Sequence, residues 1–180
     1  MRLNKLILKG FKSFANRTEI VFTPGVTTVV GPNGSGKSNI SDAVRWVLGE
    51  QSNKSLRANK ASDVIFQGTE EKKALGYAQV SIIFSNDDNS LPVEYQEVEV
   101  TRRMYRSGES EFLINNKKAR MKDVRELFLD TGVGKDGYSI IGQGRIDEIL
   151  SNKPEDRRAI FEEASGVSKY RYKKEESLRK

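Results

Sequence analysis

The chain has 180 residues, carries a formal net charge of +6 at neutral pH, and contains neither cysteine nor histidine. Disulfides and thiolate metal sites are therefore excluded, as are reactions that need an imidazole as base or metal ligand. No run of 18 apolar residues and no cleavable leader is found, so we expect a cytoplasmic protein without a membrane span. The length suits one domain, and the basic balance favours a polyanionic partner.

The N-terminal part of the chain is predicted to combine short strands with a glycine-rich loop and a helix. Residues 6–8 and 19–22 are typical of strands, and the β-branched run at residues 26–30 predicts a buried strand. This run leads directly into the loop at residues 31–38. The apolar residues that follow recur at helical spacing and predict an amphipathic helix that ends near Gly49.

The middle of the chain is predicted to be an antiparallel meander. Residues 64–66 indicate a short strand, and residues 78–84, 98–105 and 112–114 indicate three more strands, separated by turn sequences. Residues 122–130 predict a short helix.

The last part of the chain is predicted to be helical and highly charged. Ser151, Pro154 and the acids that follow are typical of a helix start. Gly166 interrupts this helix, and residues 167–180 continue it with a mostly polar sequence.

Residues 31–38 match the phosphate-loop pattern G-x-x-x-x-G-K-[ST] and lie between a predicted strand and a predicted helix, as that loop requires. Gly34 and Gly36 allow the backbone to wrap a phosphate chain without an obstructing Cβ. The backbone amides then form an anion nest at the positive end of the helix. Lys37 would place its cation between the β- and γ-phosphates, and Ser38 would offer its hydroxyl to Mg²⁺.

Two other classes of phosphate-loop protein fit the sequence less well. A GTPase needs D-x-x-G and N-K-x-D, but no Asp has a Gly three residues on, and residues 53–56 start the second pattern without its Asp. A small-molecule kinase would suit the length. It would not explain the meander or the charged terminal helix.

Three segments together resemble the N-terminal head segment of SMC (structural maintenance of chromosomes) proteins, in particular the bacterial type. They are residues 10–14 (GFKSF), 31–39 (GPNGSGKSN) and 140–144 (IIGQG), and residues 157–166 look like that family's transition to its coiled-coil arm. The resemblance implies an α/β fold: an ABC-type P-loop NTPase half-domain with a mixed or antiparallel β meander. It places the N-terminal lobe of the head at residues 1–166 and the start of the coiled coil at residues 167–180.

The resemblance also implies a site for ATP and Mg²⁺. The residues that would wrap the triphosphate are Pro32, Asn33, Gly34, Ser35, Gly36, Lys37, Ser38 and Asn39. Lys37 and Gln143 would be the catalytic residues of this segment, and Ser38 and Gln143 would approach the metal. Arg57 resembles the family's arginine loop, which approaches the nucleotide. Lys12 and Ser13 would lie near the adenine.

Two motifs of such a head are missing from the sequence. It contains no L-S-G-G signature and no Walker B strand, since the look-alike at residues 127–130 is followed by Thr131 and has a helical context. We therefore expect no ATP turnover by this chain alone. The resemblance implies four protein partners: the C-terminal half of the same head, a second head in a homodimer, a kleisin-type bridging subunit and its accessory protein.

Basic residues form three clusters that could contact the phosphates of duplex DNA without sequence specificity. Lys54, Arg57 and Lys60 recur every three residues, which predicts one side of a helix. The other clusters are at residues 102–106 and 117–122. Solvated surface charge is the alternative interpretation. The DNA-binding candidates are Lys60, Arg120 and Lys122.

The sequence thus predicts the N-terminal lobe of an SMC ATPase head that acts in chromosome condensation and segregation and is associated with the nucleoid. Three alternatives stay open at this point: a DNA-repair ATPase of the Rad-fifty or RecN type, a P-loop small-molecule kinase, and a structural coiled-coil adaptor.

Overall fold

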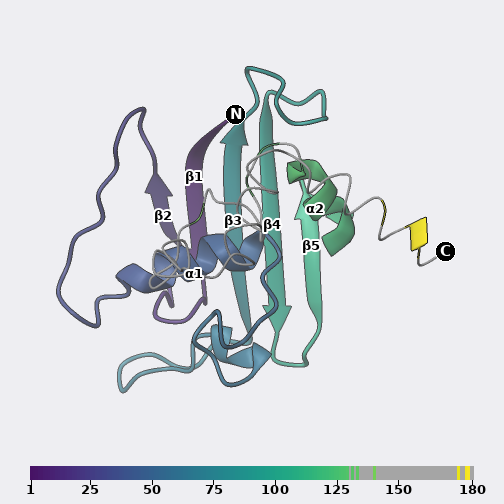
Figure 1. The fold of residues 1–180 in the computed structure, drawn as a ribbon. Helices are drawn as coiled ribbons and strands as arrows, with labels where there is room; N and C mark the ends of the chain where they lie inside the picture. The colour runs from purple at the N-terminus through teal and green to yellow at the C-terminus, as the bar shows by residue number, and fades with distance from the viewer. Residues whose placement is uncertain (130, 132, 134–139, 141–173, 175–176, 179–180) are drawn as a thin grey trace, which may run out of the picture.

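The fold is built on an antiparallel sheet with the strand order β2-β1-β3-β4-β5-β6 (Figure 1). This computed structural model describes residues 1–129, 131, 133, 140, 174 and 177–178. The strands are β1 (Arg2–Lys9), β2 (Thr18–Val21), β3 (Tyr77–Ser85), β4 (Glu97–Tyr105), β5 (Ser110–Ile114) and β6 (Lys117–Ala119). The predicted strands at 6–8 and 19–22 and the predicted meander are confirmed, with ends that shift by a few residues.

One face of the sheet carries the hydrophobic core. Successive side chains of a strand point to opposite faces, so alternate apolar residues gather on one of them. The buried residues of this row are Leu6 and Leu8 of β1, Val80, Ile82 and Phe84 of β3, and Val98 and Val100 of β4. Cross-strand pairing joins these side chains into one layer.

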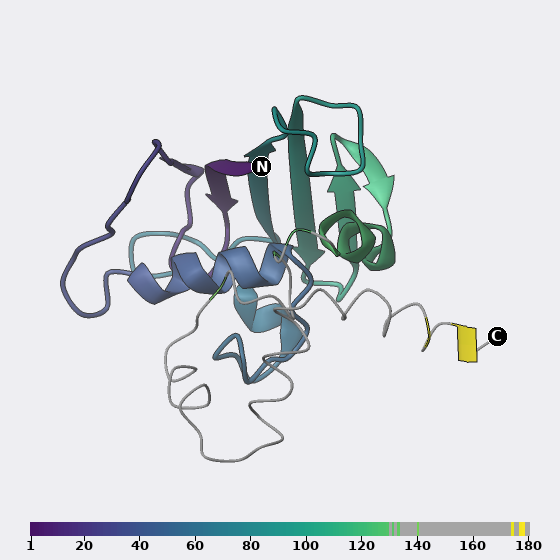
Figure 2. The same cartoon turned by 45° about the horizontal axis from the view of Figure 1, so that its top comes forward.

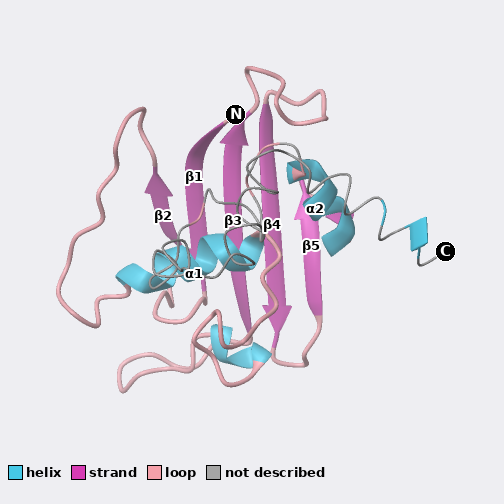
Figure 3. Ribbon diagram, viewed as in Figure 1, coloured by secondary structure: helices cyan, strands magenta, loops and turns pink. Residues whose placement is uncertain are grey.

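Two helices cover this apolar face. The helix α1 (Lys37–Val47) crosses β3 and β4, and α2 (Met121–Phe128) packs on β5 (Figure 3). Turned by 45°, the ribbon shows both helices on the same side of the sheet (Figure 2). Trp46 and Val47 of α1 are buried, and Phe128 of α2 packs edge-on against Phe84 with ring centroids 5.3 Å apart. Both predicted helices are therefore confirmed over their described residues.

The prediction of a buried strand at residues 26–30 is wrong. The segment is irregular, and Val26 and Val30 are 95% and 83% exposed. It belongs to a long exposed connection between β2 and α1 (Figure 1). The β-branched sequence favours a strand, but none of the described strands pairs with it, and an unpaired strand does not persist.

Two further predictions are corrected by the structure. Residues 54–60 form turns instead of a helix, and Arg57 has a left-handed φ of 51° that no regular helix contains. Instead of a strand at residues 64–66, a 3₁₀ helix η1 (Ala61–Val64) is followed by an isolated bridge between Ile65 and Phe11.

The predicted helices after residue 150 lie outside the described residues, apart from the helical, exposed positions 174, 177 and 178. The predicted boundary at residue 166 lies outside them too. Within the described part of the chain, no helix is long and apolar enough to cross a membrane.

Candidate functional site

The glycine-rich loop lies at the exposed N-terminal end of α1. The helix begins at Lys37 with Gly36 as its N-cap, and its first turn contains neither a capping side chain nor an acidic residue. The first amides of a helix have no partner within the helix and carry its positive partial charge. This end of α1 is therefore open to an anion from outside the helix.

Backbone conformation at two positions of the loop requires glycine. Gly34 has φ 83° with open space around the position of a Cβ, and Gly36 has φ 92°. A Cβ at Gly36 would lie 2.6 Å from Oγ of Ser13. The left-handed backbone strains any larger residue at both positions, and at Gly36 the hydroxyl of Ser13 would also have to move, so glycine suits both positions of the motif.

Lys37 crosses the loop with its side chain. Its Nζ donates to the carbonyl oxygens of Gly31 at 2.6 Å and Pro32 at 2.7 Å. These exposed hydrogen bonds can be exchanged for phosphate oxygens at little cost, because both sets are polar and in contact with water. The ammonium group thus lies where the chain of phosphates would pass. Ser38 follows in the first turn of α1, which begins two residues earlier than the end of the predicted loop would suggest.

The loop at residues 10–14 lies against this end of α1. Asn39 donates from Nδ2 to Oγ of Ser13 at 2.9 Å, which joins two of the predicted site residues. The loop is anchored by Phe11, which is fully buried, and by the amide of Lys12, which donates to the carbonyl of Val64 at 2.7 Å. Ser13 is therefore held beside the phosphate loop.

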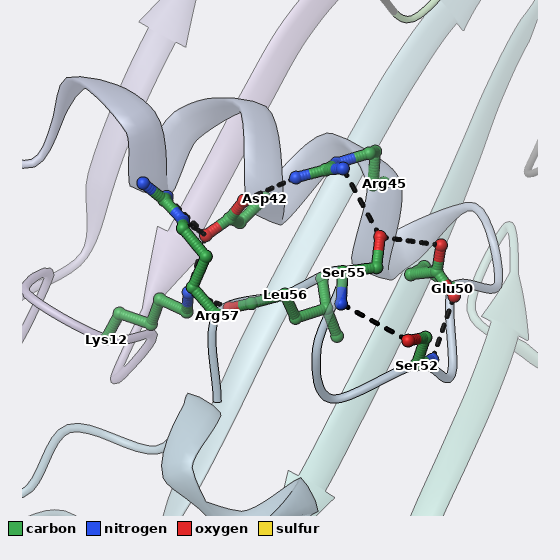
Figure 4. A network of polar contacts seen from close by, with 8 residues as sticks. All are labelled: Lys12, Asp42, Arg45, Glu50, Ser52, Ser55, Leu56 and Arg57. Atoms are coloured by element: carbon green, nitrogen blue, oxygen red, sulfur yellow. Dashed lines mark hydrogen bonds and ion pairs between the residues drawn. The ribbon is translucent and has the colours of Figure 1, made fainter. Parts of the chain in front are cut away.

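Lys12 and Arg57, also predicted for the site, meet on a carboxylate that the sequence did not single out. Asp42 of α1 is only 1% exposed, and Nζ of Lys12 approaches its Oδ2 at 2.5 Å (Figure 4). Arg57 donates to the same oxygen from Nη2 at 2.5 Å and from Nε at 3.2 Å. Arg45 donates from Nη2 to Oδ1 at 2.8 Å. The only sequence signal for Asp42 is a carboxylate next to the apolar stripe of the helix.

These cations determine the charge state of Asp42. Burial alone would raise the pKa of Asp42, but hydrogen bonds from Lys12, Arg57 and Arg45, together with the charge of Lys12, hold that pKa below its ordinary value. The carboxylate is therefore ionised at neutral pH and balances part of the positive charge gathered around it.

The segment that carries Arg57 is fastened to α1 by further polar contacts (Figure 4). Arg45 donates from Nη1 to Oγ of Ser55 at 3.3 Å, and Ser55 donates to Oε2 of Glu50 at 3.0 Å. Nζ of Lys12 also donates to the carbonyl of Leu56, whose side chain is buried. Contacts of the two residues that precede Arg57, Ser55 and Leu56, thus fix its position relative to α1.

The side chains of the basic clusters differ in burial and in ion pairing, and both affect whether a polyanion can contact them. Arg102 is buried, so this member of its cluster is a core residue. Lys60 precedes η1, while Arg120 pairs with Asp123 at 2.9 Å and Lys122 with Glu126 at 3.6 Å in α2. Such surface pairs are weak and leave their charges at the protein surface. The three DNA-binding candidates therefore stay a prediction.

Gln143 lies outside the described residues. In the part of the chain that is described, no group of three or more acidic residues could hold a metal ion. The role of Ser38 as a metal ligand therefore stays a prediction.

Comparisons with known proteins show the family to which the chain is similar. Residues 2–151 match the family described as the RecF/RecN/SMC N terminal domain. The whole chain is 59% identical to "Chromosome partition protein Smc" of Clostridium kluyveri and 58% identical to its namesake in Bacillus subtilis. The chain spans 15% of the length of each of these two relatives.

A solved structure has a closely similar fold. The head domain of Smc from Pyrococcus furiosus, with an extended coiled coil and bound to the C-terminal domain of ScpA, superposes with a TM-score of 0.87. It is 40% identical in sequence, and the match covers 99% of this chain and 45% of that chain.

Proposed function

The chain belongs to the RecF/RecN/SMC N-terminal domain family, and from this premise we propose that it is the ATP-binding N-terminal lobe of an Smc-type ATPase head. The observation that carries the proposal is the open end of α1. There, left-handed glycines, the backbone amides at the start of α1 and the ammonium of Lys37 lie together on one exposed loop. Backbone amides at a helix start, backed by a lysine, favour a chain of phosphates.

Within this proposal, the residues of the loop share the work of binding. Residues 32–39 wrap the triphosphate, and Lys37 neutralises charge on the β- and γ-phosphates. Ser38 would give its hydroxyl to Mg²⁺, a hard cation that prefers oxygen ligands, and Gln143 would bind the metal or the attacking water. Lys12 and Ser13 approach the adenine. The structure limits the role of Lys12, since its amine is already engaged by Asp42.

The exposed connection before the loop supports a second part of the proposal, completion of the head by a C-terminal segment. Val26 and Val30 of this connection are both more than half exposed, as is Val21 at the end of β2. A β-branched run with unpaired backbone groups is a ready template for strands of another segment. We propose that the C-terminal half of the same head covers it and supplies the Walker B and signature residues.

The activity of the complete protein follows from this architecture and from its relatives' names. Two heads of a homodimer would bind ATP between them, hydrolysis would separate them, and the cycle would act on duplex DNA in chromosome partition. A bridging subunit like the ScpA seen with the Pyrococcus furiosus head would complete the assembly. Identity of 59% to a chromosome partition protein favours this function over a repair ATPase or a small-molecule kinase.

Substitution of Lys37 tests the proposed function. In the full-length protein that contains this chain, Lys37→Ala should lower ATP affinity at least about a hundredfold, because a charge-assisted contact to the phosphates is lost together with charge balance in the loop. Calorimetry with ATP and Mg²⁺ measures this affinity. The variant should melt like the parent protein, since Lys37 bonds only to exposed carbonyls. Near-parental affinity in the folded variant would contradict the assignment of the loop.

A further inference from the structure

Lys12 and Arg57 have an unusual backbone conformation in common. Among the described residues, five other than glycine have a positive φ, and three of these are asparagines, which tolerate that region in turns. The other two are Lys12, with φ 49°, and Arg57, with φ 51°. Their side chains end on the same oxygen of Asp42. Strained backbone that persists on two separate loops around one carboxylate indicates a functional constraint at that carboxylate.

Arg57 is anchored on one edge and free on the other. Its Nε and one N–H of Nη2 are donated to Asp42, which leaves Nη1 and the second N–H of Nη2 without a described partner. The side chain of Arg57 is 47% exposed, while that of Asp42 is 1% exposed. In Figure 4 one nitrogen of the guanidinium points away from Asp42 along α1 towards its N-terminal end. The planar group therefore presents a fork of donors to solvent in a fixed direction.

This fork lies close to the phosphate loop. Asp42 follows Lys37 by five residues, about 7.5 Å along the helix axis at 1.5 Å per residue. Asn39 and Asp42 are three residues apart and share one face of α1. Asn39 contacts Ser13 at the loop, so Asp42, which holds Arg57, lies about one helical turn beyond that contact.

We propose that Asp42 is a positioning residue for ATP binding. It accepts hydrogen bonds from one edge of the Arg57 guanidinium, so that the free edge can donate to the phosphates of ATP in the loop. Lys12 and Arg45 keep the carboxylate ionised and fixed, from Oδ2 and Oδ1 respectively. The inference rests on the proposed function, since it assumes that a nucleotide occupies the loop.

The direction in which ATP affinity changes when the Asp42 carboxylate is removed distinguishes a positioning role from a purely electrostatic one. By Coulomb's law alone, removing a carboxylate near the loop would strengthen the binding of an anionic nucleotide. If Asp42 positions Arg57, its removal instead weakens ATP binding, because the guanidinium loses its fixed orientation and must be ordered on binding. A purely structural Asp42 would lower the melting temperature without this dependence on Arg57.

The test is a double-mutant cycle for ATP affinity in the full-length protein. Asp42→Asn should weaken ATP binding roughly three- to tenfold, and Arg57→Ala roughly tenfold, as expected for a lost charged hydrogen bond. In the Arg57→Ala background, Asp42→Asn should change the affinity by less than about twofold. Tighter binding by Asp42→Asn, or an equal loss in both backgrounds, would overturn the proposal.

Two additional variants keep the outcome interpretable. If Asp42→Asn does not fold, Arg57→Lys replaces it, because lysine keeps the charge but cannot bond two ways to Asp42 and still present a free edge. It should lose nearly as much ATP affinity as Arg57→Ala, and affinity within about twofold of the parent would overturn the proposal. Lys37→Ala is measured in parallel. If Lys37→Ala also binds ATP normally, the proposed function fails; if only the Asp42 and Arg57 results fail, the phosphate loop stands.

Discussion

Arg102 is the residue in which burial and charge conflict most directly. It is 7% exposed, and its guanidinium lies between the rings of Trp46 at 4.6 Å and Phe112 at 4.9 Å. Its Nη1 donates to the carbonyls of Trp46 and Glu50 at 2.9 and 2.8 Å, at the C-terminal end of α1. Burial lowers the pKa of Arg102 to about 10, against the opposing charge of Glu50, so it stays cationic at neutral pH. A cation at this end complements the helix dipole.

Arg102→Met should therefore destabilise the fold by about 1–3 kcal/mol, because two carbonyls lose a charged donor and the cation–π contacts disappear. Arg103→Met is the matched control on the neighbouring position of β4. Arg103 is partly exposed and pairs with Glu111 at 3.2 Å, so its loss should cost less than about 1 kcal/mol. Denaturant unfolding measures both, and equal losses would contradict the structural role of Arg102.

At the scale of elements, the connection between β2 and α1 separates what sequence can and cannot predict. The β-branched residues at 26–30 favour the pleated, half-buried surface of a strand in a sheet. Whether a neighbouring strand exists is a property of the tertiary structure, so a strand was predicted where the described residues offer no pairing. The meander was predicted correctly because each of its strands from β3 to β6 pairs with the next strand along the chain.

The exposed run gives a prediction of its own. Val26→Asp and Val30→Asp, made together, should weaken association with the C-terminal half of the head at least about tenfold, since buried charge on a strand edge opposes pairing. The stability of the described sheet should be unchanged, because both side chains are exposed in it. Tyr95→Asp, at another exposed position, is the control. Co-purification of the separately expressed halves measures association, and undiminished binding by the double variant would contradict the docking proposal.

The candidate site was predictable to a similar, partial extent. The phosphate-loop motif occupies eight consecutive residues, and the apolar spacing after it predicted the helix, so Lys37, Ser38 and the glycines could be proposed from sequence. The contact between Ser13 and Asn39 joins distant segments, and only the resemblance pointed to Ser13. Asp42 was missed, because its partners come from loops 30 residues before it and 15 residues after it.

The three-residue spacing of Lys54, Arg57 and Lys60 suggested a helix that the left-handed Arg57 rules out.

At the scale of the whole molecule, the net charge of +6 leads to a prediction about DNA. Reversing the charges of Lys60, Arg120 and Lys122 together should weaken duplex binding by assembled, ATP-engaged heads without lowering ATP affinity. Each lost phosphate contact should reduce the slope of log affinity against log salt by roughly 0.9. Binding measured over a series of salt concentrations gives this slope. An unchanged slope would identify the three residues as solvated surface charge.

The division of the head into two segments is the central claim, and ATP turnover by complemented segments tests it most directly. The purified 180-residue chain should show no ATPase activity above background, because the sequence lacks a Walker B motif and a signature motif. Adding the C-terminal segment, in trans or through a linker, should produce turnover that Lys37→Ala abolishes. Steady turnover by the chain alone, itself lost in Lys37→Ala, would contradict the account and favour a self-contained phosphate-loop enzyme.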